Sequence, residues 1–163
     1  MRLEVADEIA KSLIKDRLPR HWRWELKYHN SVTTWGWCSS ETKVISLSRP
    51  LICFNGEALL REVVLHEIAH AIVDTYYHKQ GHNQNWKRTA IALGSSGRRL
   101  IFNTTPPPPR FQGKCDHCGN IYSANKRYLS CEFCPTWGTK LQKCKMAWGK
   151  HPFWESLAVS QAS

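Results

Sequence analysis

The chain has 163 residues, 42% hydrophobic and 22% charged, which is enough to bury the core of one ordinary domain and leaves room for a small appendage. No stretch approaches 18 consecutive apolar residues, and the N-terminus (MRLEVADEIAKSL) is charged and amphipathic, so a membrane span and a secretory signal are both excluded. The net charge of +10 is unevenly distributed. Residues 1–82 carry 11 Lys and Arg against 10 Asp and Glu, whereas residues 83–163 carry 12 against 3. This excess of positive charge favours a polyanion such as nucleic acid as the partner of the second half.

The first third of the chain predicts one helix and three short strands. Apolar residues at helical spacing predict a helix over residues 3–18, and Pro19 ends it. Alternating or apolar segments predict strands over residues 22–28, 33–38 and 43–51. Because the links between them are short, we expect an antiparallel meander with Pro50 at a strand end.

Two helices are expected next. Asn55 is a candidate N-cap for a strongly apolar helix that continues to about Tyr77. Asn83 is a candidate cap for a second helix over residues 84–93, which Gly94 closes. Residues 106–109 are four prolines, which form a stiff spacer, and we place a domain boundary there.

The long helix contains the sequence His66-Glu67-Ile68-Ala69-His70. Residues four apart lie on one helical face, so two imidazoles can bind one zinc ion, while Glu67 is placed to reach a water on the metal and take its proton. The alternative is that these are exposed polar residues of a helix that bind no metal. A catalytic site needs a third ligand, and no downstream acidic residue lies on a suitable helix.

Histidines 78 and 82 are the remaining candidates for that third ligand. If the helix continued, His78 would lie about 12 Å beyond His70, too far to share the ion. His82 follows Lys79-Gln80-Gly81, a link that can reverse the chain and return the imidazole to the metal, although a lone histidine is often only a surface residue.

With these residues in place, the chain resembles the SprT-like zinc metallopeptidases, a family that includes the DNA–protein-crosslink protease Spartan. The matching features over roughly residues 5–140 are the strand Ile45-Ser46-Leu47-Ser48, the HEIAH motif, and Gly81-His82 followed by the aromatic Trp86. The family usually has glycine after the third histidine and phenylalanine at the aromatic position, where this chain has Asn83 and Trp86. The resemblance implies peptide-bond hydrolysis, with DNA-bound or DNA-crosslinked protein as substrate and a role in DNA repair.

The cysteine pattern predicts a second, structural zinc. Seven cysteines, odd in number and unevenly spaced, argue against a secreted disulfide framework and for metal ligation in an intracellular, reducing compartment (cytoplasm, nucleoid or nucleus). Cys115-x-x-Cys118 and Cys131-x-x-Cys134 form a four-thiolate signature, which fits a closed tetrahedral site in a zinc ribbon. Redox or disulfide pairing is the alternative. Many SprT-like proteins likewise carry a C-terminal ribbon.

Basic residues interleave with aromatic ones around this ribbon, a pattern typical of nucleic-acid binding. The cations can follow phosphates, and exposed rings can stack on the unpaired bases of single-stranded or frayed DNA. The alternative is that the aromatic residues form the small core of the ribbon. The candidate contacts are Arg110, Lys126, Arg127, Lys140, Lys143 and Lys145.

Together these observations predict an α+β, zincin-like domain (residues 1–105), a proline-rich linker (106–113), a zinc ribbon (114–150) and a C-terminal tail (151–163). We expect a zinc endopeptidase with one catalytic and one structural zinc, acting on DNA-bound protein, with no membrane contact. One alternative is a non-enzymatic DNA-binding zinc protein whose metal helix is structural. Another is a general peptidase whose basic tail binds an acidic protein.

Overall fold

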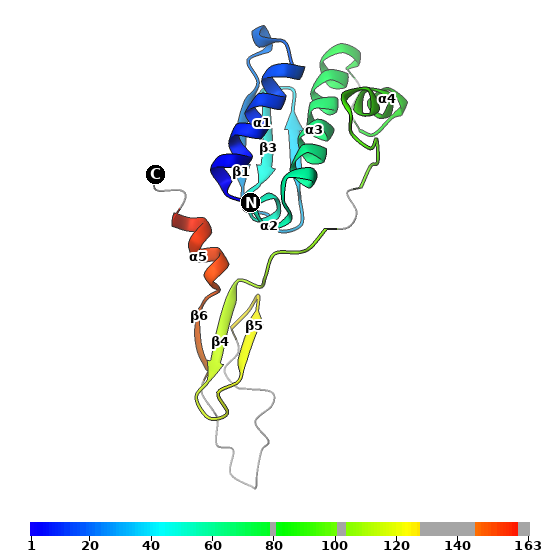
Figure 1. Cartoon of the computed structure of the whole chain (residues 1–163). Helices are drawn as coiled ribbons and strands as arrows, with labels where there is room; N and C mark the ends of the chain where they lie inside the picture. Colours follow the sequence, from blue (N-terminus) through cyan, green and yellow to red (C-terminus); the bar gives the residue numbers. More distant parts are fainter. Residues whose placement is uncertain (79–80, 101–103, 128–145, 160–163) are drawn as a thin grey trace. The chain divides into compact units, whose positions relative to one another are not determined.

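The computed structural model describes residues 1–78, 81–100, 104–127 and 146–159, and the chain divides into two compact units, Met1–Pro107 and Pro108–Ser163 (Figure 1). The dividing point lies inside the run of prolines at 106–109. Proline has no backbone N–H and a fixed φ, so such a run cannot extend a helix or join the interior of a sheet. Each unit has its own sheet.

The N-terminal unit begins with helix α1 (Leu3–Arg17) and a short 3₁₀ turn, η1 (Arg20–Trp22). A three-stranded sheet follows, formed by β1 (Glu25–His29), β2 (Gly36–Ser39) and β3 (Val44–Ser48). The predicted helix at the N-terminus and the α+β class are confirmed. The first strand begins three residues later than expected because residues 20–22 form the 3₁₀ turn.

The strand order is β1-β3-β2, so the predicted antiparallel meander is wrong. β2 and β3 form an antiparallel hairpin, with Gly36 opposite Leu47, but β1 runs parallel to β3, with Tyr28 also opposite Leu47. All five residues of β3 are buried. The most apolar strand therefore takes the centre, where both of its edges are paired, and the alternation of side chains along a strand does not reveal that order.

Residues 49–55 form helix α2 (Arg49–Asn55) rather than the end of a strand, which corrects the strand predicted to reach residue 51. The hydroxyl of Ser48 accepts a hydrogen bond from the Leu51 N–H, and Pro50 occupies the first turn, where its missing N–H does no harm. Asn55 is not the N-cap of the next helix. Its side chain instead bonds the backbone N–H and C=O of Thr105 and the carbonyl of Leu51.

Helix α3 (Glu57–Tyr77) and helix α4 (Gln84–Leu93) complete the unit. Gly56, with φ +91°, separates α2 from α3. The predicted bounds of α4 are confirmed: the Asn83 side chain accepts a hydrogen bond from the backbone N–H of Trp86, and Gly94 ends the helix in the left-handed region at φ +97°.

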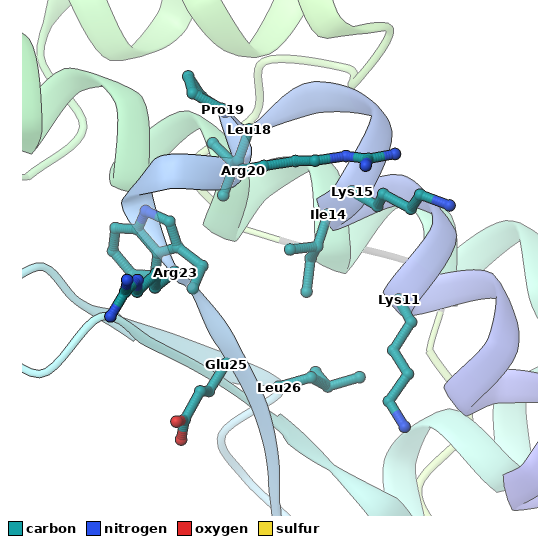
Figure 2. A pocket seen from close by; sticks show the side chains of 10 residues that line it. Lys11, Ile14, Lys15, Leu18, Pro19, Arg20, Arg23, Glu25 and Leu26 are labelled. Atoms are coloured by element: carbon teal, nitrogen blue, oxygen red, sulfur yellow. The ribbon is translucent and has the colours of Figure 1, made fainter.

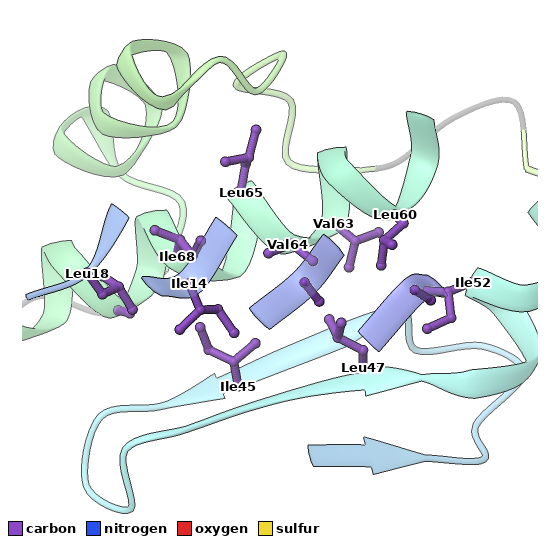
Figure 3. Packing of buried hydrophobic residues seen from close by; sticks show 13 residues of the cluster. Ile14, Leu18, Ile45, Leu47, Ile52, Leu60, Val63, Val64, Leu65 and Ile68 are labelled. Carbon is purple, nitrogen blue, oxygen red and sulfur yellow. The ribbon is translucent and has the colours of Figure 1, made fainter. Parts of the chain in front are cut away.

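The core of this unit lies between one face of the sheet and helices α1 and α3, which pack against each other. Figure 3 shows Ile14 from α1 and Val64 and Ile68 from α3 meeting Ile45 and Leu47 of the central strand. These side chains are at most 8% exposed, and truncating one of the larger ones to alanine would cost about 2–5 kcal/mol. This packing holds α3 against the sheet along the segment that contains the motif His66-Glu67-Ile68-Ala69-His70.

The C-terminal unit contains an antiparallel sheet of order β5-β4-β6 and a final helix. Its described elements are β4 (Phe111–Cys115), β5 (Ile121–Ala124), β6 (Met146–Lys150) and α5 (Pro152–Val159). β4 begins within the predicted linker (106–113), and α5 lies within the predicted tail (151–163). Of the helices in the described ranges, none has both the length and the apolar character that crossing a bilayer requires.

Candidate metal centre

Helix α3 carries His66, Glu67 and His70 on a segment that is buried on almost every side. His66 is 7% exposed and Glu67 only 6%, because this part of the helix contacts both the sheet and α4. His70 is half-buried, and burying polar side chains in this way is costly unless each has a partner or a ligand.

The chain turns back after α3. Tyr77 is the last helical residue, and His78 ends the helix in the left-handed region, with φ +49°. Gly81 also has a positive φ, +85°, which a glycine adopts without strain. His82 follows directly, before the Asn83 cap of α4, so the start of α4 holds it against α3.

The three histidines that the sequence singled out lie together. Nε2 of His82 is 2.9 Å from Nε2 of His66 and 3.2 Å from Nε2 of His70. Imidazole nitrogens bound to tetrahedral zinc at about 2.0–2.1 Å would be roughly 3.3 Å apart, so this donor set fits the ion. Among the described residues these three form the one cluster able to hold a metal.

The histidines are poised as neutral ligands. Burial, and then the charge of neighbouring histidines, lowers the pKa of His66 and of His70 to about 4. The pKa of His82 is lowered too, by burial and then by the positive charge of Arg99. A neutral imidazole has a free lone pair for a metal, so little proton release opposes binding near neutral pH.

Glu67 lies beside the cluster and against the sheet. Burial raises the pKa of its carboxyl group to about 8, and a divalent cation beside it would favour the ionised form. A Cβ atom added at Gly36 would lie 3.1 Å from both Cγ and Oε1 of Glu67. The absence of a side chain at Gly36 in β2 therefore leaves the space that the Glu67 side chain fills.

Trp86 on α4 contacts all three histidines. Its ring stacks on His70 at 5.3 Å between centroids and lies edge-on to His66 and His82 at 4.7 and 4.4 Å. The indole N–H donates a hydrogen bond of 3.4 Å to the carbonyl oxygen of His66. Trp86 is 1% exposed, so its own position is fixed by packing, and its contacts limit the orientations that the three imidazole rings can adopt.

A cleft of about 450 Å³ opens in front of the histidines and Glu67. Strand β2 and the turn after it form the opposite wall, with Trp37 and Glu41 among the lining residues, and Asp74 lines the α3 side. Sequence reasoning missed these residues and Gly36. The one sequence signal for Gly36 is its position within a strand pattern, because a single glycine there often marks a place where another group approaches the backbone closely.

The predicted ribbon cysteines are only partly within the described residues. Cys115 and Cys118 lie in one tight turn, closed by hydrogen bonds from the Gly119 N–H to the Cys115 carbonyl and from the Cys115 N–H to the Asn120 carbonyl. Cys131 and Cys134 lie outside the described residues. The structural zinc therefore stays a prediction.

Three of the predicted nucleic-acid contacts, Arg110, Lys126 and Arg127, are exposed at one end of the β4–β5 pair. The guanidinium of Arg110 lies 5.7 Å from the ring centroid of Trp154, and that of Arg127 lies 4.6 Å from the ring centroid of Phe111. Lys140, Lys143 and Lys145 lie outside the described residues. Nucleic-acid binding by this surface stays a prediction.

Comparison with known proteins adds one finding. The sequence model of the SprT-like family matches residues 5–106, which cover the sheet, α3, the three histidines and α4. No curated protein and no solved structure matches the chain.

Proposed function

Because this chain belongs to the SprT-like family, we propose that it is a zinc-dependent endopeptidase with His66, His70 and His82 as metal ligands. The observation that carries the proposal is the convergence of three Nε2 atoms beside a buried glutamate, at the wall of an open cleft. Zinc, when bound, polarises a carbonyl group and makes water acidic enough to be deprotonated near pH 7.

Glu67 is the general base of the proposed reaction. Its carboxylate takes a proton from the attacking water and then gives it to the amine that leaves when the peptide bond breaks. Burial favours this role because it raises the pKa of the group toward the working pH, where proton transfer in both directions is efficient.

Strand β2 supplies the backbone along which a substrate peptide lies. In the described residues β2 pairs only with β3, so its outer edge is available, and its residues Gly36–Ser39 line the cleft. An extended peptide added to this edge would pass directly in front of the histidines. The substrate is therefore an unstructured segment, which can adopt the strand conformation.

The rival function is a non-enzymatic, DNA-binding zinc protein with a structural metal. A structural zinc is closed by a fourth Cys, His or carboxylate ligand. The cluster in the described part of the chain has three ligands, and the cleft lies in front of them. This arrangement favours the enzyme.

The substrates in this proposal are proteins bound or crosslinked to DNA. The support is the net charge of +9 in residues 83–163, together with the exposed cations Arg110, Lys126 and Arg127. Binding to the phosphate backbone raises the local concentration of DNA-bound protein around the peptidase.

The decisive experiment compares wild type, Glu67→Gln and Glu57→Gln, all loaded with zinc. Glu57 is an exposed glutamate of the same helix, paired with Arg61 at 2.7 Å, so its replacement is a matched control. We expect Glu67→Gln to lower cleavage of an unstructured protein at least 100-fold with unchanged zinc content, and Glu57→Gln to leave it within twofold. Near-normal turnover by Glu67→Gln would exclude this glutamate as the base.

The DNA-directed part is tested separately. Cleavage of a DNA-binding protein is measured with single-stranded DNA, with duplex and without DNA, from 50 to 200 mM salt. We expect DNA to accelerate cleavage and added salt to reduce this acceleration. The reduction with salt should be steeper in wild type than in a variant in which Arg110, Lys126 and Arg127 are changed to Glu. Equal cleavage with and without DNA would leave a general peptidase.

A further inference from the structure

A second hollow in the N-terminal unit lies away from the metal centre. It has a volume of about 590 Å³ and lies between the second half of α1, the η1 turn and the start of β1 (Figure 2). None of its lining residues belongs to the cleft in front of the histidines. We call it the basic groove and define it by Lys11, Lys15, Arg20, Arg23 and Trp24.

The groove gathers positive charge from two parts of the chain. Lys11 and Lys15 come from α1, whereas Arg20 and Arg23 come from η1 and the residue after it. Glu25 is its single acidic lining residue and lies 3.6 Å from Lys27, while Lys11 is paired with Asp7 at 2.7 Å.

The other three cations, Lys15, Arg20 and Arg23, are exposed and have no ion pair in the described part of the chain. The lining therefore carries a net charge of +3, from four Lys and Arg and one Glu. Like charges gathered around one hollow repel each other, and a bound polyanion removes that repulsion.

Between these cations the groove is apolar. Figure 2 shows the side chains of Ile14 and Leu26 between Arg23 on one side and Lys11 on the other. Trp24 adds an indole whose Nε1–H is buried and has no hydrogen-bond partner among the described residues. A complementary ligand combines negative charge with a flat apolar part.

A nucleotide has both features, since it joins a phosphate to a planar base. Arginine forks bind phosphate oxygens in pairs, and an aromatic ring beside a cationic groove is typical of proteins that bind single strands. An acidic peptide offers the charge but not the planar group, and a duplex hides its bases. We propose that the basic groove binds a short segment of single-stranded nucleic acid, a contact on the peptidase unit itself that is separate from the basic residues of the C-terminal half.

The test uses the full chain and two triple variants with the same change of charge. The groove variant is Lys15→Gln, Arg20→Gln and Arg23→Gln. The control variant is Arg2→Gln, Arg17→Gln and Arg61→Gln, which removes three exposed cations of residues 1–82 that do not line the groove. Binding of a fluorescein-labelled 20-residue oligothymidylate is measured by anisotropy from 50 to 200 mM salt, and thermal melting checks that both variants are folded.

We expect the groove variant to bind at least about tenfold more weakly at 100 mM salt, and the slope of log K against log salt to become shallower by about 2, since each lost phosphate contact contributes roughly 0.7. The control should stay within about threefold of wild type. Equal losses in the two variants would show a general charge effect and overturn the proposal. A polyglutamate peptide that displaces the oligonucleotide with similar affinity, or a duplex that depends more strongly on the groove, would overturn the assignment to single strands.

The binding comparison does not depend on peptidase activity. Both variants should cleave a DNA-free, unstructured protein at the wild-type rate, because neither set of substitutions touches the metal centre. If wild type itself cleaves nothing, the proposed function fails while the binding comparison still decides the groove. Loss of both binding and DNA-free cleavage in the groove variant would mean that the fold is altered and would refute a local binding site.

Discussion

Replacing Gly36 by alanine is expected to impair catalysis without releasing the metal. The new Cβ would lie 3.1 Å from Cγ and Oε1 of Glu67 and 3.1 Å from the carbonyl oxygen of Ser46, closer than the 3.4–4 Å of ordinary contacts. Ser46 is held in the central strand opposite Trp37, so its carbonyl cannot move away. The Glu67 side chain must therefore shift by a few tenths of an ångström.

The size of the effect follows from that shift. A misplacement of about 1 Å can reduce a rate about 100-fold, so we expect Gly36→Ala to lower kcat about tenfold. Overpacking costs about 1–3 kcal/mol, and alanine in a strand regains roughly 0.5–1 kcal/mol relative to glycine, so the unfolding free energy should fall by about 1 kcal/mol. The three atoms nearest to the new Cβ belong to Glu67 and Ser46 and not to a metal ligand, so zinc content should stay constant.

The assay measures kcat and KM on an unstructured protein together with zinc content and urea unfolding. Gly149→Ala is the matched control, since Gly149 also lies in a strand and no described atom comes within 4 Å of its added Cβ. A Gly36→Ala enzyme with the kcat of wild type would refute the view that this glycine positions Glu67. Loss of zinc in parallel with activity would refute it as well, because the damage would then reach the metal ligands.

Three further predictions concern the metal, its support and the loop beside α3. A chelator should abolish cleavage and lower the melting temperature, and added zinc should restore both, because the ion binds only the folded chain. Trp86→Leu should weaken zinc binding about 10- to 100-fold in a competition titration, more than Trp86→Phe, because the contacts that orient the imidazoles are lost. Burial alone would raise the pKa of Glu62, but hydrogen bonds from Ser96 and Ser95 hold it below its usual 4.5. Glu62→Gln should therefore lower the unfolding free energy by about 1 kcal/mol at pH 7, and this difference from wild type should vanish as the pH falls below about 4.5, where the wild-type carboxylate becomes protonated.

Local patterns were enough to predict helices α1, α3 and α4 and the core of the site. The bounds of α4, including the Asn83 cap and the Gly94 end, follow from residues within a few positions of each other. The same holds for His66, Glu67 and His70, whose relative positions any helix fixes. These features need no knowledge of the rest of the fold.

The strand order was not predictable in this way. Alternating side chains describe a strand equally well at the centre or the edge of a sheet, and in a parallel or an antiparallel pair. The strand predicted over residues 43–51 extends past Ser48 into Arg49, Pro50 and Leu51, which belong to α2. The hydrogen bond from the Leu51 N–H to the Ser48 hydroxyl decides for a helix instead.

By itself, the sequence determined helices α1, α3 and α4, the metal-binding motif and the uneven charge of the two halves. Only the tertiary structure decided that His82 comes within 3.2 Å of the other two imidazoles, that Gly36 makes room for Glu67, and that four cations of a nearly neutral half surround one groove. The physical reason is distance along the chain. Helical spacing and caps depend on neighbours within one or two turns, whereas these three arrangements depend on how the sheet, α1, α3 and α4 pack against each other.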